Sequence, residues 1–158
     1  MRFLIGLLAA CLLPSASFAQ NLKASDPQAM AERIRSLGYK ADLQKDSDGD
    51  PVINSSTDGS SFIVAFYDCK KGMNCEWVMF YKGYGFEKGK YPKARQLADE
   101  WNMTVNFSKI SIDDDSIHQS LNLIMNNEGI GPELFDANFA TWISEYVDLR
   151  RKISDIYK

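Results

Sequence analysis

The sequence predicts an α+β fold in which three helices pack on one antiparallel β-sheet. Two observations lead to this prediction. Candidate strands follow one another in runs joined by short turns, an arrangement that makes neighbouring strands antiparallel. Segments with helical periodicity occur before, between and after these runs and do not alternate with single strands, which excludes a doubly wound α/β fold. With 45% hydrophobic and 25% charged residues, the 158-residue chain has the composition of a folded domain.

The first residues are typical of a secretory signal peptide. Arg2 supplies a positive charge, and residues 3–13 form an apolar run that is too short for a membrane-spanning helix, which needs about 20 residues. Ser17 and Ala19 have the small side chains of a cleavage site. The expected signal peptide therefore covers residues 1–19.

Cleavage after Ala19 would leave residues 20–158 as a single domain, periplasmic or secreted, with no stable membrane anchor. A second interpretation stays open, because residues 8–11 match a bacterial lipoprotein site that would be cut before Cys11 and lipidated there. Ordinary cleavage removes Cys11 with the leader. It leaves Cys69 and Cys75, and an even number of cysteines in an oxidising compartment indicates a disulfide.

The helices are predicted from apolar residues that recur every three or four positions. The segments with this spacing are residues 26–37, residues 92–102, and a long segment that begins near Pro132 and runs almost to the end of the chain. Ser25 or Asp26 can cap the first helix, and Gly38 fits the left-handed residue that ends it.

The strands are predicted from aromatic and β-branched residues between turn signals. They are expected over residues 39–44, 52–55, 62–68, 76–84, 104–112 and 116–125. The third and fourth are the strongest, and they flank the cysteine pair.

Cys69 and Cys75 enclose a five-residue loop between these two strands, so a disulfide there would lock a hairpin. A redox role is disfavoured, because redox-active pairs usually have the tighter C-x-x-C spacing. If the two cysteines face each other, Tyr67 faces Trp77, Ala65 faces Met79 and Ile63 faces Tyr81 on one side of the hairpin.

The two faces of this hairpin are both apolar, which an antiparallel sheet requires only where both faces are covered. One face is expected to pack on the helices. The other is expected to bind a partner, because an exposed apolar patch marks an interaction site. The candidate surface residues are Tyr67, Trp77, Met79 and Tyr81.

Composition argues against several kinds of function. A net charge of -3 does not suit a nucleic-acid binder, and His118 is the only histidine, which removes most zinc sites and rich acid–base clusters. Residues 46–50 resemble the start of a calcium loop, but Pro51 and Thr57 stand where such a loop needs Gly and Glu. We therefore expect a solvated turn there, no metal, no cofactor and no enzymatic activity.

Several short segments, taken in order, resemble the YbjN family of bacterial sensory transduction regulators. They are the Cys69 and Cys75 hairpin, Trp101-Asn102, Phe107-Ser108-Lys109-Ile110, Leu121-Asn122-Leu123 and Glu128-Gly129-Ile130. The resemblance implies one domain with a fold like that of type III secretion chaperones, a binding or scaffold role, frequent dimerisation and no catalytic residues. The leader departs from the family pattern and suggests an exported subgroup.

The function expected from these features is that of an exported, non-enzymatic regulatory or chaperone-like domain. It would bind a protein partner, with a second copy of the chain as one candidate. The alternative is a small-ligand-binding protein with a pocket beneath Tyr67, Trp77 and Tyr81. A hydrolase is a third hypothesis, and it would require Asp, Glu or His118 side chains to converge in a cleft.

Overall fold

The computed structural model describes residues 20–156, in which three helices and six antiparallel strands confirm the predicted α+β fold. In chain order the elements are α1 (Pro27–Ser36), β1 (Lys40–Lys45), β2 (Pro51–Thr57), β3 (Ser60–Tyr67), β4 (Trp77–Gly85), the short 3-10 turn η1 (Lys88–Lys90), α2 (Tyr91–Thr104), β5 (Lys109–Ile112), β6 (Ser116–Ile124) and α3 (Pro132–Ile156). The predicted signal peptide and the alternative lipoprotein site at Cys11 lie outside the described residues.

The strands form one sheet in the order β1-β2-β3-β4-β6-β5, so β6 lies between β4 and β5. The β3–β4 hairpin has the predicted register: Tyr67 pairs with Trp77, and Ala65 pairs with Met79. The pairing of β6 with β4 is long and continues to Ile124, whereas β5 pairs with β6 only as far as Ser120.

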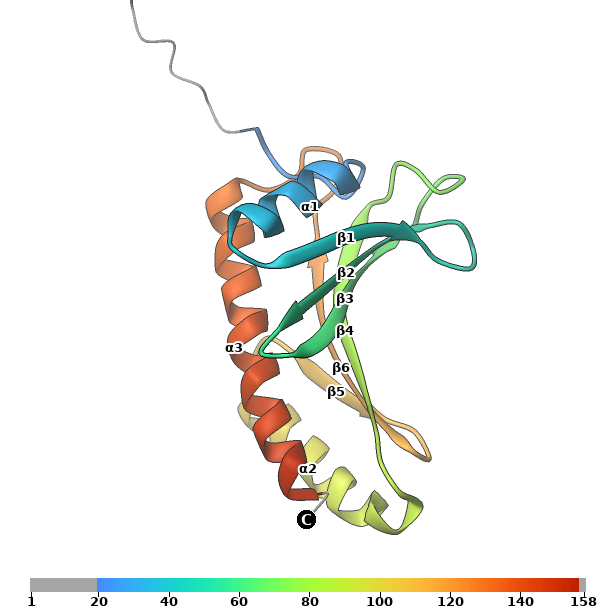
Figure 1. Ribbon diagram of the computed structural model, residues 1–158, viewed down its shortest axis with the longest axis vertical. Coiled ribbons are helices and arrows are strands. Elements are labelled where there is room, and N and C mark those ends of the chain that lie inside the picture. Colours follow the sequence, from blue (N-terminus) through green and yellow to red (C-terminus); the bar gives the residue numbers. More distant parts are fainter. Residues whose placement is uncertain (1–19, 157–158) are drawn as a thin grey trace, which may run out of the picture.

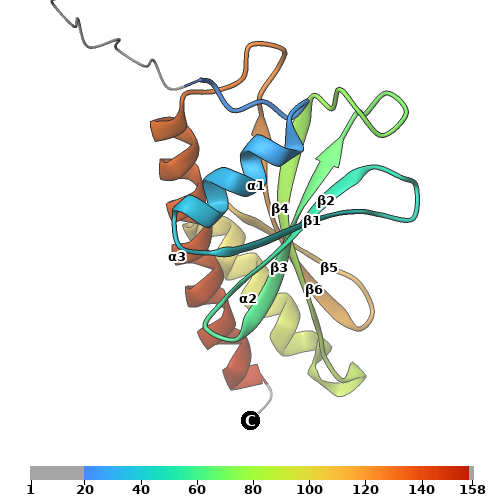
Figure 2. The ribbon, with the colours of Figure 1, turned by 45° about the horizontal axis from the view of Figure 1, so that its top comes forward.

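The helices cover one face of this sheet (Figures 1 and 2). α3 runs along the whole face, with α1 near its first half and α2 near its second half. Alternate strand residues point toward them and are fully buried, among them Val64, Val78 and Phe80. Within residues 20–156, no helix has both the length and the apolar composition needed to cross a membrane.

The prediction of a strand over residues 104–112 is wrong for its first half. α2 continues to Thr104, and only Lys109–Ile112 form β5. Side chains near the end of α2 fold the connection back: the Trp101 indole donates to the Ser108 carbonyl, and the Asn102 amide exchanges hydrogen bonds with the backbone of Ile110. These bonds, between residues seven and eight positions apart, hold the connection in a turn and not in an extended strand.

Both ends of α1 follow the sequence signals. The Asp26 carboxylate caps the helix by accepting a hydrogen bond of 3.0 Å from the Ala29 N–H, and Gly38 adopts a φ of +89° after it. The segment before the helix also belongs to the fold, because Leu22 is buried and forms a bridge with Ile130.

Candidate functional site

The face of the sheet that points away from α3 carries the four residues singled out from the sequence. Tyr67, Trp77, Met79 and Tyr81 all lie on it and are half-buried, whereas their strand neighbours on the other face are buried. We call this the open face. Its central members are Val52, Asn54, Ile63, Ala65, Tyr67, Trp77, Met79, Tyr81, Ser120, Asn122 and Ile124.

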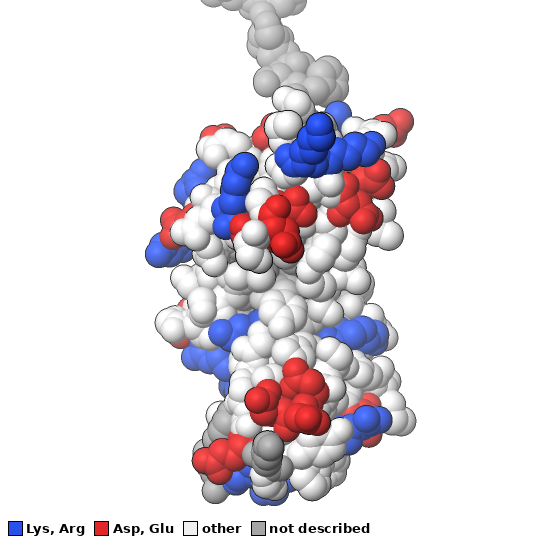
Figure 3. All heavy atoms as spheres, turned by 90° about the vertical axis from the view of Figure 1, so that its right-hand side faces the viewer, with Lys and Arg blue, Asp and Glu red and all other residues white. Residues whose placement is uncertain are grey.

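The open face is mostly uncharged at its centre. In Figure 1 the β1–β2 turn and the β5–β6 turn project to the right on either side of it. Figure 3 views the molecule from that side and shows a largely uncharged band across the middle, with acidic and basic groups above and below. The exposed apolar surface therefore has a charged rim, as interaction surfaces of proteins commonly do.

Two stacked aromatic rings lie at one end of the open face. Tyr67 and Trp77 have ring centroids 4.2 Å apart and an angle of 11° between the ring planes. The Trp77 indole N–H donates to the Asp68 carboxylate over 2.8 Å, which holds the indole at a defined angle. On the neighbouring strand β6, Ile124 pairs with Trp77, and Ile124 is 78% exposed.

An open groove of about 460 Å³ lies beside this aromatic pair. Trp77 and Ile124 provide its apolar surface, and Asp68 and Glu76 provide two carboxylates. Asn122 and Asn126 complete the lining. The groove is therefore both apolar and acidic, and we call it the Trp77 groove.

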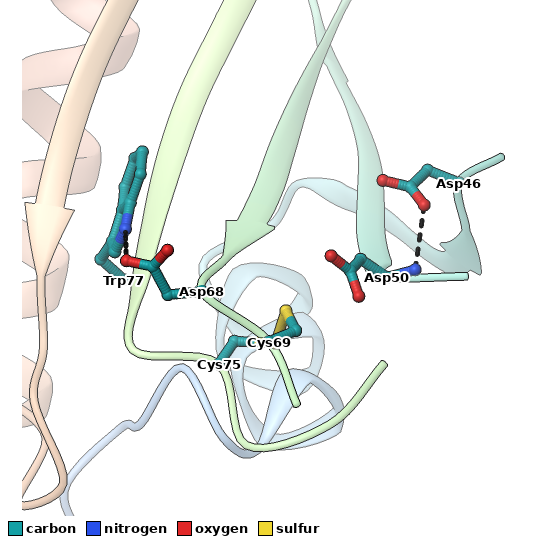
Figure 4. The surroundings of a disulfide bond; sticks show 6 residues. All are labelled: Asp46, Asp50, Asp68, Cys69, Cys75 and Trp77. Carbon is teal, nitrogen blue, oxygen red and sulfur yellow. Dashed lines mark hydrogen bonds between the residues drawn. A yellow bond between two sulfur atoms is a disulfide. The ribbon is translucent and has the colours of Figure 1, made fainter. Parts of the chain in front are cut away.

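The predicted disulfide is present between Cys69 and Cys75. It joins the residues that directly follow Asp68 and precede Glu76, so it holds the two carboxylates of the Trp77 groove at the base of one loop. Figure 4 shows Asp68 between the disulfide and the Trp77 indole. Asp68 and Glu76 lie just beyond the β3–β4 ladder, which ends at Tyr67 and Trp77.

Three polar side chains form a hydrogen-bonded chain at the opposite end of the open face. The Tyr81 hydroxyl lies 2.6 Å from Nδ1 of His118, and Nε2 of His118 lies 2.7 Å from the Asp113 carboxylate. The hydrogen bond from His118 lowers the pKa of Asp113, so this carboxylate is an acceptor at neutral pH. Nε2 is therefore placed to donate to Asp113, and Nδ1 faces the Tyr81 hydroxyl.

Burial is the main cause of the raised pKa of Tyr81, and the Asp113 charge adds to it, so the hydroxyl stays a donor at neutral pH. Both ring nitrogens of His118 are engaged in these hydrogen bonds. The hydrolase hypothesis requires acidic side chains or His118 to converge in a cleft. Among the described residues, Asp113 is the one carboxylate hydrogen-bonded to His118, and the other partner of His118 is Tyr81.

The space beneath the aromatic hairpin is filled. Phe62 and Phe80 of the sheet pack against Trp142 of α3, each with ring centroids 5.8 Å from it, and all three are buried. A ligand of the kind considered in the alternative hypothesis would therefore have to bind on the exposed side of Tyr67 and Trp77, not beneath them.

The Asp46 carboxylate stabilises the β1–β2 turn. It accepts from the backbone N–H of Asp48 at 3.0 Å. It also accepts from the backbone N–H of Asp50 at 2.9 Å, as Figure 4 shows. Across residues 20–156, no three His, Cys, Asp or Glu side chains are grouped so that they could hold a metal ion.

Sequence reasoning missed the contribution of β6 to the open face. Asn122 and Ile124 lie there beside β4, and Ile124 forms part of the Trp77 groove. A local signal existed, because the alternation that places Leu121 and Leu123 in the core points their neighbours outward. The adjacency of β6 to β4 had no such signal, since β5 precedes β6 in the chain.

One comparison with known proteins identifies a relationship. Residues 26–154 match the model of a protein family described as "YbjN: Putative bacterial sensory transduction regulator". No curated protein and no solved structure matches the chain significantly.

Proposed function

Because the chain belongs to the YbjN family of bacterial sensory transduction regulators, we propose that it is a regulatory protein that acts by binding a protein partner through its open face. The observation that carries this proposal is the row of half-buried Tyr67, Trp77, Met79 and Tyr81 side chains on a sheet face that no described element covers. The proposed activity is binding without a catalytic step, as the family description of a regulator suggests.

Burial of the open face would stabilise a complex. Burying apolar surface is favourable by about 25 cal/mol for each Å² removed from water. A complex in which a partner covers the open face would therefore be stabilised without any rearrangement of the sheet. Tyrosine and tryptophan are enriched among the residues that contribute most to protein–protein binding. Both occur here on rigid strands, where their rotamers are restrained before a partner arrives.

We further propose that this binding takes place after export, in the periplasm or outside the cell. The leader-like pattern of residues 1–19 and the Cys69–Cys75 disulfide support this location, since structural disulfides persist in oxidising compartments. A second copy of the chain is one candidate partner, and a chaperone-like role toward an exported protein is another.

Site-specific crosslinking in the native organism tests the proposal. A photoreactive amino acid at Met79, on the open face, should form a defined crosslink to one protein, identified by mass spectrometry and then reconstituted from purified components. The matched control is the same amino acid at Gln96, which is exposed on α2. Substitution Met79→Glu should weaken the reconstituted complex at least about tenfold, because it places a charge in the buried centre of the contact.

Equal crosslinks from Met79 and Gln96, or a complex that tolerates Met79→Glu, would contradict the assignment of the open face. Sedimentation of the purified protein distinguishes the two kinds of partner. A concentration-dependent dimer that Met79→Glu dissociates identifies a second copy, whereas a monomer that still gives the Met79 crosslink identifies a different protein.

A further inference from the structure

The Trp77 groove carries more chemical information about a partner than the rest of the open face. Its Trp77 and Ile124 side chains suit an apolar stem, and its Asp68 and Glu76 carboxylates suit a cationic head. Ammonium and guanidinium groups are also attracted to the face of an indole ring, most strongly where water is excluded. The inference below rests on the proposed function and names the chemistry of the partner.

Among the described residues, the two carboxylates have no cationic partner. No Lys or Arg among the described residues lies within ion-pair distance of Asp68 or Glu76. The disulfide nevertheless keeps both residues beside Trp77, although like charges held together repel. A bound cation would relieve this repulsion, so the charge of the groove is complementary to a basic ligand.

The strand next to the groove has a free edge. β4 pairs with β6 as far as Ile124, but β5 stops pairing at Ser120, so no described strand lies beside residues 121–124 on that side. The Met125 N–H donates to the Glu76 carbonyl and thus points toward β4. Because backbone groups alternate sides along an antiparallel strand, those of Asn122 and Ile124 point toward the free edge.

These features fit an extended segment better than a free small cation. Neighbouring strands lie about 4.8 Å apart, so a segment paired with β6 would be about two spacings from Trp77. The long side chain of Arg or Lys can lie over Ile124 and bring its charged end to Trp77, Asp68 and Glu76. Strand addition at an open sheet edge is an established way for proteins to bind extended segments.

We propose that the Trp77 groove binds an Arg or Lys side chain of an extended segment of a protein partner, and that this segment pairs with the free edge of β6 at Asn122–Ile124. The partner is thus identified by its chemistry: an extended stretch with basic residues on one face.

Three fluorescein-labelled peptides test the proposal by fluorescence anisotropy. The first alternates Arg and Thr, the second replaces every Arg by citrulline, which has the same shape without the charge, and the third carries N-methyl groups on alternate backbone nitrogens. The first should bind, the second at least about tenfold more weakly because the charge is lost, and the third similarly weakly because it cannot complete a strand ladder.

Variants of the protein locate the binding. Asp68→Asn together with Glu76→Gln should weaken the Arg–Thr peptide about tenfold, while the amide oxygen introduced by Asp68→Asn can still accept from the Trp77 indole and preserve the site. The control is Asp48→Asn with Asp114→Asn, which removes the same charge from exposed turns elsewhere and should change affinity less than twofold. The Trp77 indole signal in ¹⁵N NMR spectra should shift on binding, and the signals of buried Trp101 and Trp142 should not.

Equal binding of the citrulline peptide, equal losses in the two double variants, or full competition by tetramethylammonium would overturn the proposal. Equal losses would indicate attraction to the net charge alone, and competition would indicate a small-cation site. The proposed function is tested separately by the Met79 crosslink. If any of these outcomes is observed while the Met79 crosslink still forms, the open face remains the proposed binding surface and only the basic segment is rejected.

Discussion

At the scale of single residues, two neighbouring tyrosines differ in what their hydroxyl groups contact. Tyr146 of α3 donates to the Ser60 hydroxyl and also lies 3.3 Å from the Ser61 carbonyl. The hydroxyl of Tyr84 on β4 is buried and has no hydrogen-bond partner among the described residues, although the two rings are only 6.4 Å apart. A buried hydroxyl without a partner lowers stability, because it loses its hydrogen bonds to water.

Substitution Tyr84→Phe is therefore expected to leave the free energy of unfolding unchanged or raise it by about 1 kcal/mol. The matched change Tyr146→Phe removes a satisfied hydroxyl and should lower it by about 1 kcal/mol. Urea denaturation followed by circular dichroism measures both values. A larger loss in Tyr84→Phe than in Tyr146→Phe would contradict the difference in hydrogen bonding.

Tyr84 should also affect how the free energy of unfolding changes at alkaline pH. Burial raises the pKa of Tyr84 well above its ordinary value near 10, so the folded protein resists forming the phenolate. The associated stability is fully present below pH 10 and is lost as the pH rises above 10 toward the folded-state pKa. The slope of unfolding free energy against pH above 10 should thus be shallower in Tyr84→Phe than in wild type.

At the scale of the element, the β3–β4 hairpin combines a strand ladder with a covalent closure. The loop over residues 69–75 has four successive constraints: the disulfide, the two hydrogen bonds between Lys70 and Met73, and Gly72 at a φ of +72°. A side chain at Gly72 would place its Cβ 2.5 Å from the Gly49 carbonyl oxygen. The loop therefore packs closely against the β1–β2 turn as well as shaping the Trp77 groove.

Replacing both cysteines, as Cys69→Ser/Cys75→Ser, should lower the free energy of unfolding by about 2 kcal/mol, since a closed loop of this size restricts the unfolded chain by roughly that amount. The β3–β4 register should persist, because the ladder from Ile63 to Tyr67 does not depend on the bond. The control Met73→Ser changes an exposed side chain in the same loop and should have no measurable effect. Chemical denaturation and amide NMR signals of the strands provide the two measurements.

At the scale of the whole molecule, one helix joins two hydrophobic clusters. The first half of α3 packs with α1 and the β2–β4 region through residues such as Phe139 and Trp142. The second half packs with α2 and β5 through Leu149 and Ile153, in a cluster that also contains Trp101. Because a single continuous helix enters both clusters, loss of one should be transmitted to the other.

Substitution Ile153→Ala in the second cluster is expected to destabilise the entire chain by about 2 to 4 kcal/mol. The indole NMR signals of Trp101 and Trp142, one from each cluster, should disappear in a single transition at the same temperature. The control Leu134→Ala, at an exposed position of α3, should cost less than about 1 kcal/mol. Two separate transitions would contradict cooperative coupling through α3.

The elements that can be predicted well depend on local sequence patterns. The periodicity of α3 and the alternation of β3 and β4 are repeated over many residues, and the positions of Cys69 and Cys75 are enough to predict the register of the hairpin. The sequence pattern ends α2 too early, because Trp101 and Asn102 bond to residues that follow the turn. No short-range pattern contains that information.

The candidate site divides in the same way. Alternation along the hairpin is enough to predict that Tyr67, Trp77, Met79 and Tyr81 share one face. The Trp77 groove also needs Ile124, which lies far along the chain from Trp77 and reaches it only because β6 inserts between β4 and β5. The hydrogen-bonded chain from Asp113 through His118 to Tyr81 depends on the same insertion.

Local sequence patterns are enough to predict the α+β class, the positions of the helices, the hairpin register and the apolar character of both hairpin faces, because propensity, side-chain period and disulfide spacing act over a few residues. Three features become visible only in the folded protein: which of those faces α3 covers, which strand lies beside β4, and where β5 leaves the edge of β6 free. Those features depend on packing between segments that are distant in the chain, including the two clusters that α3 joins, and no local pattern encodes such contacts.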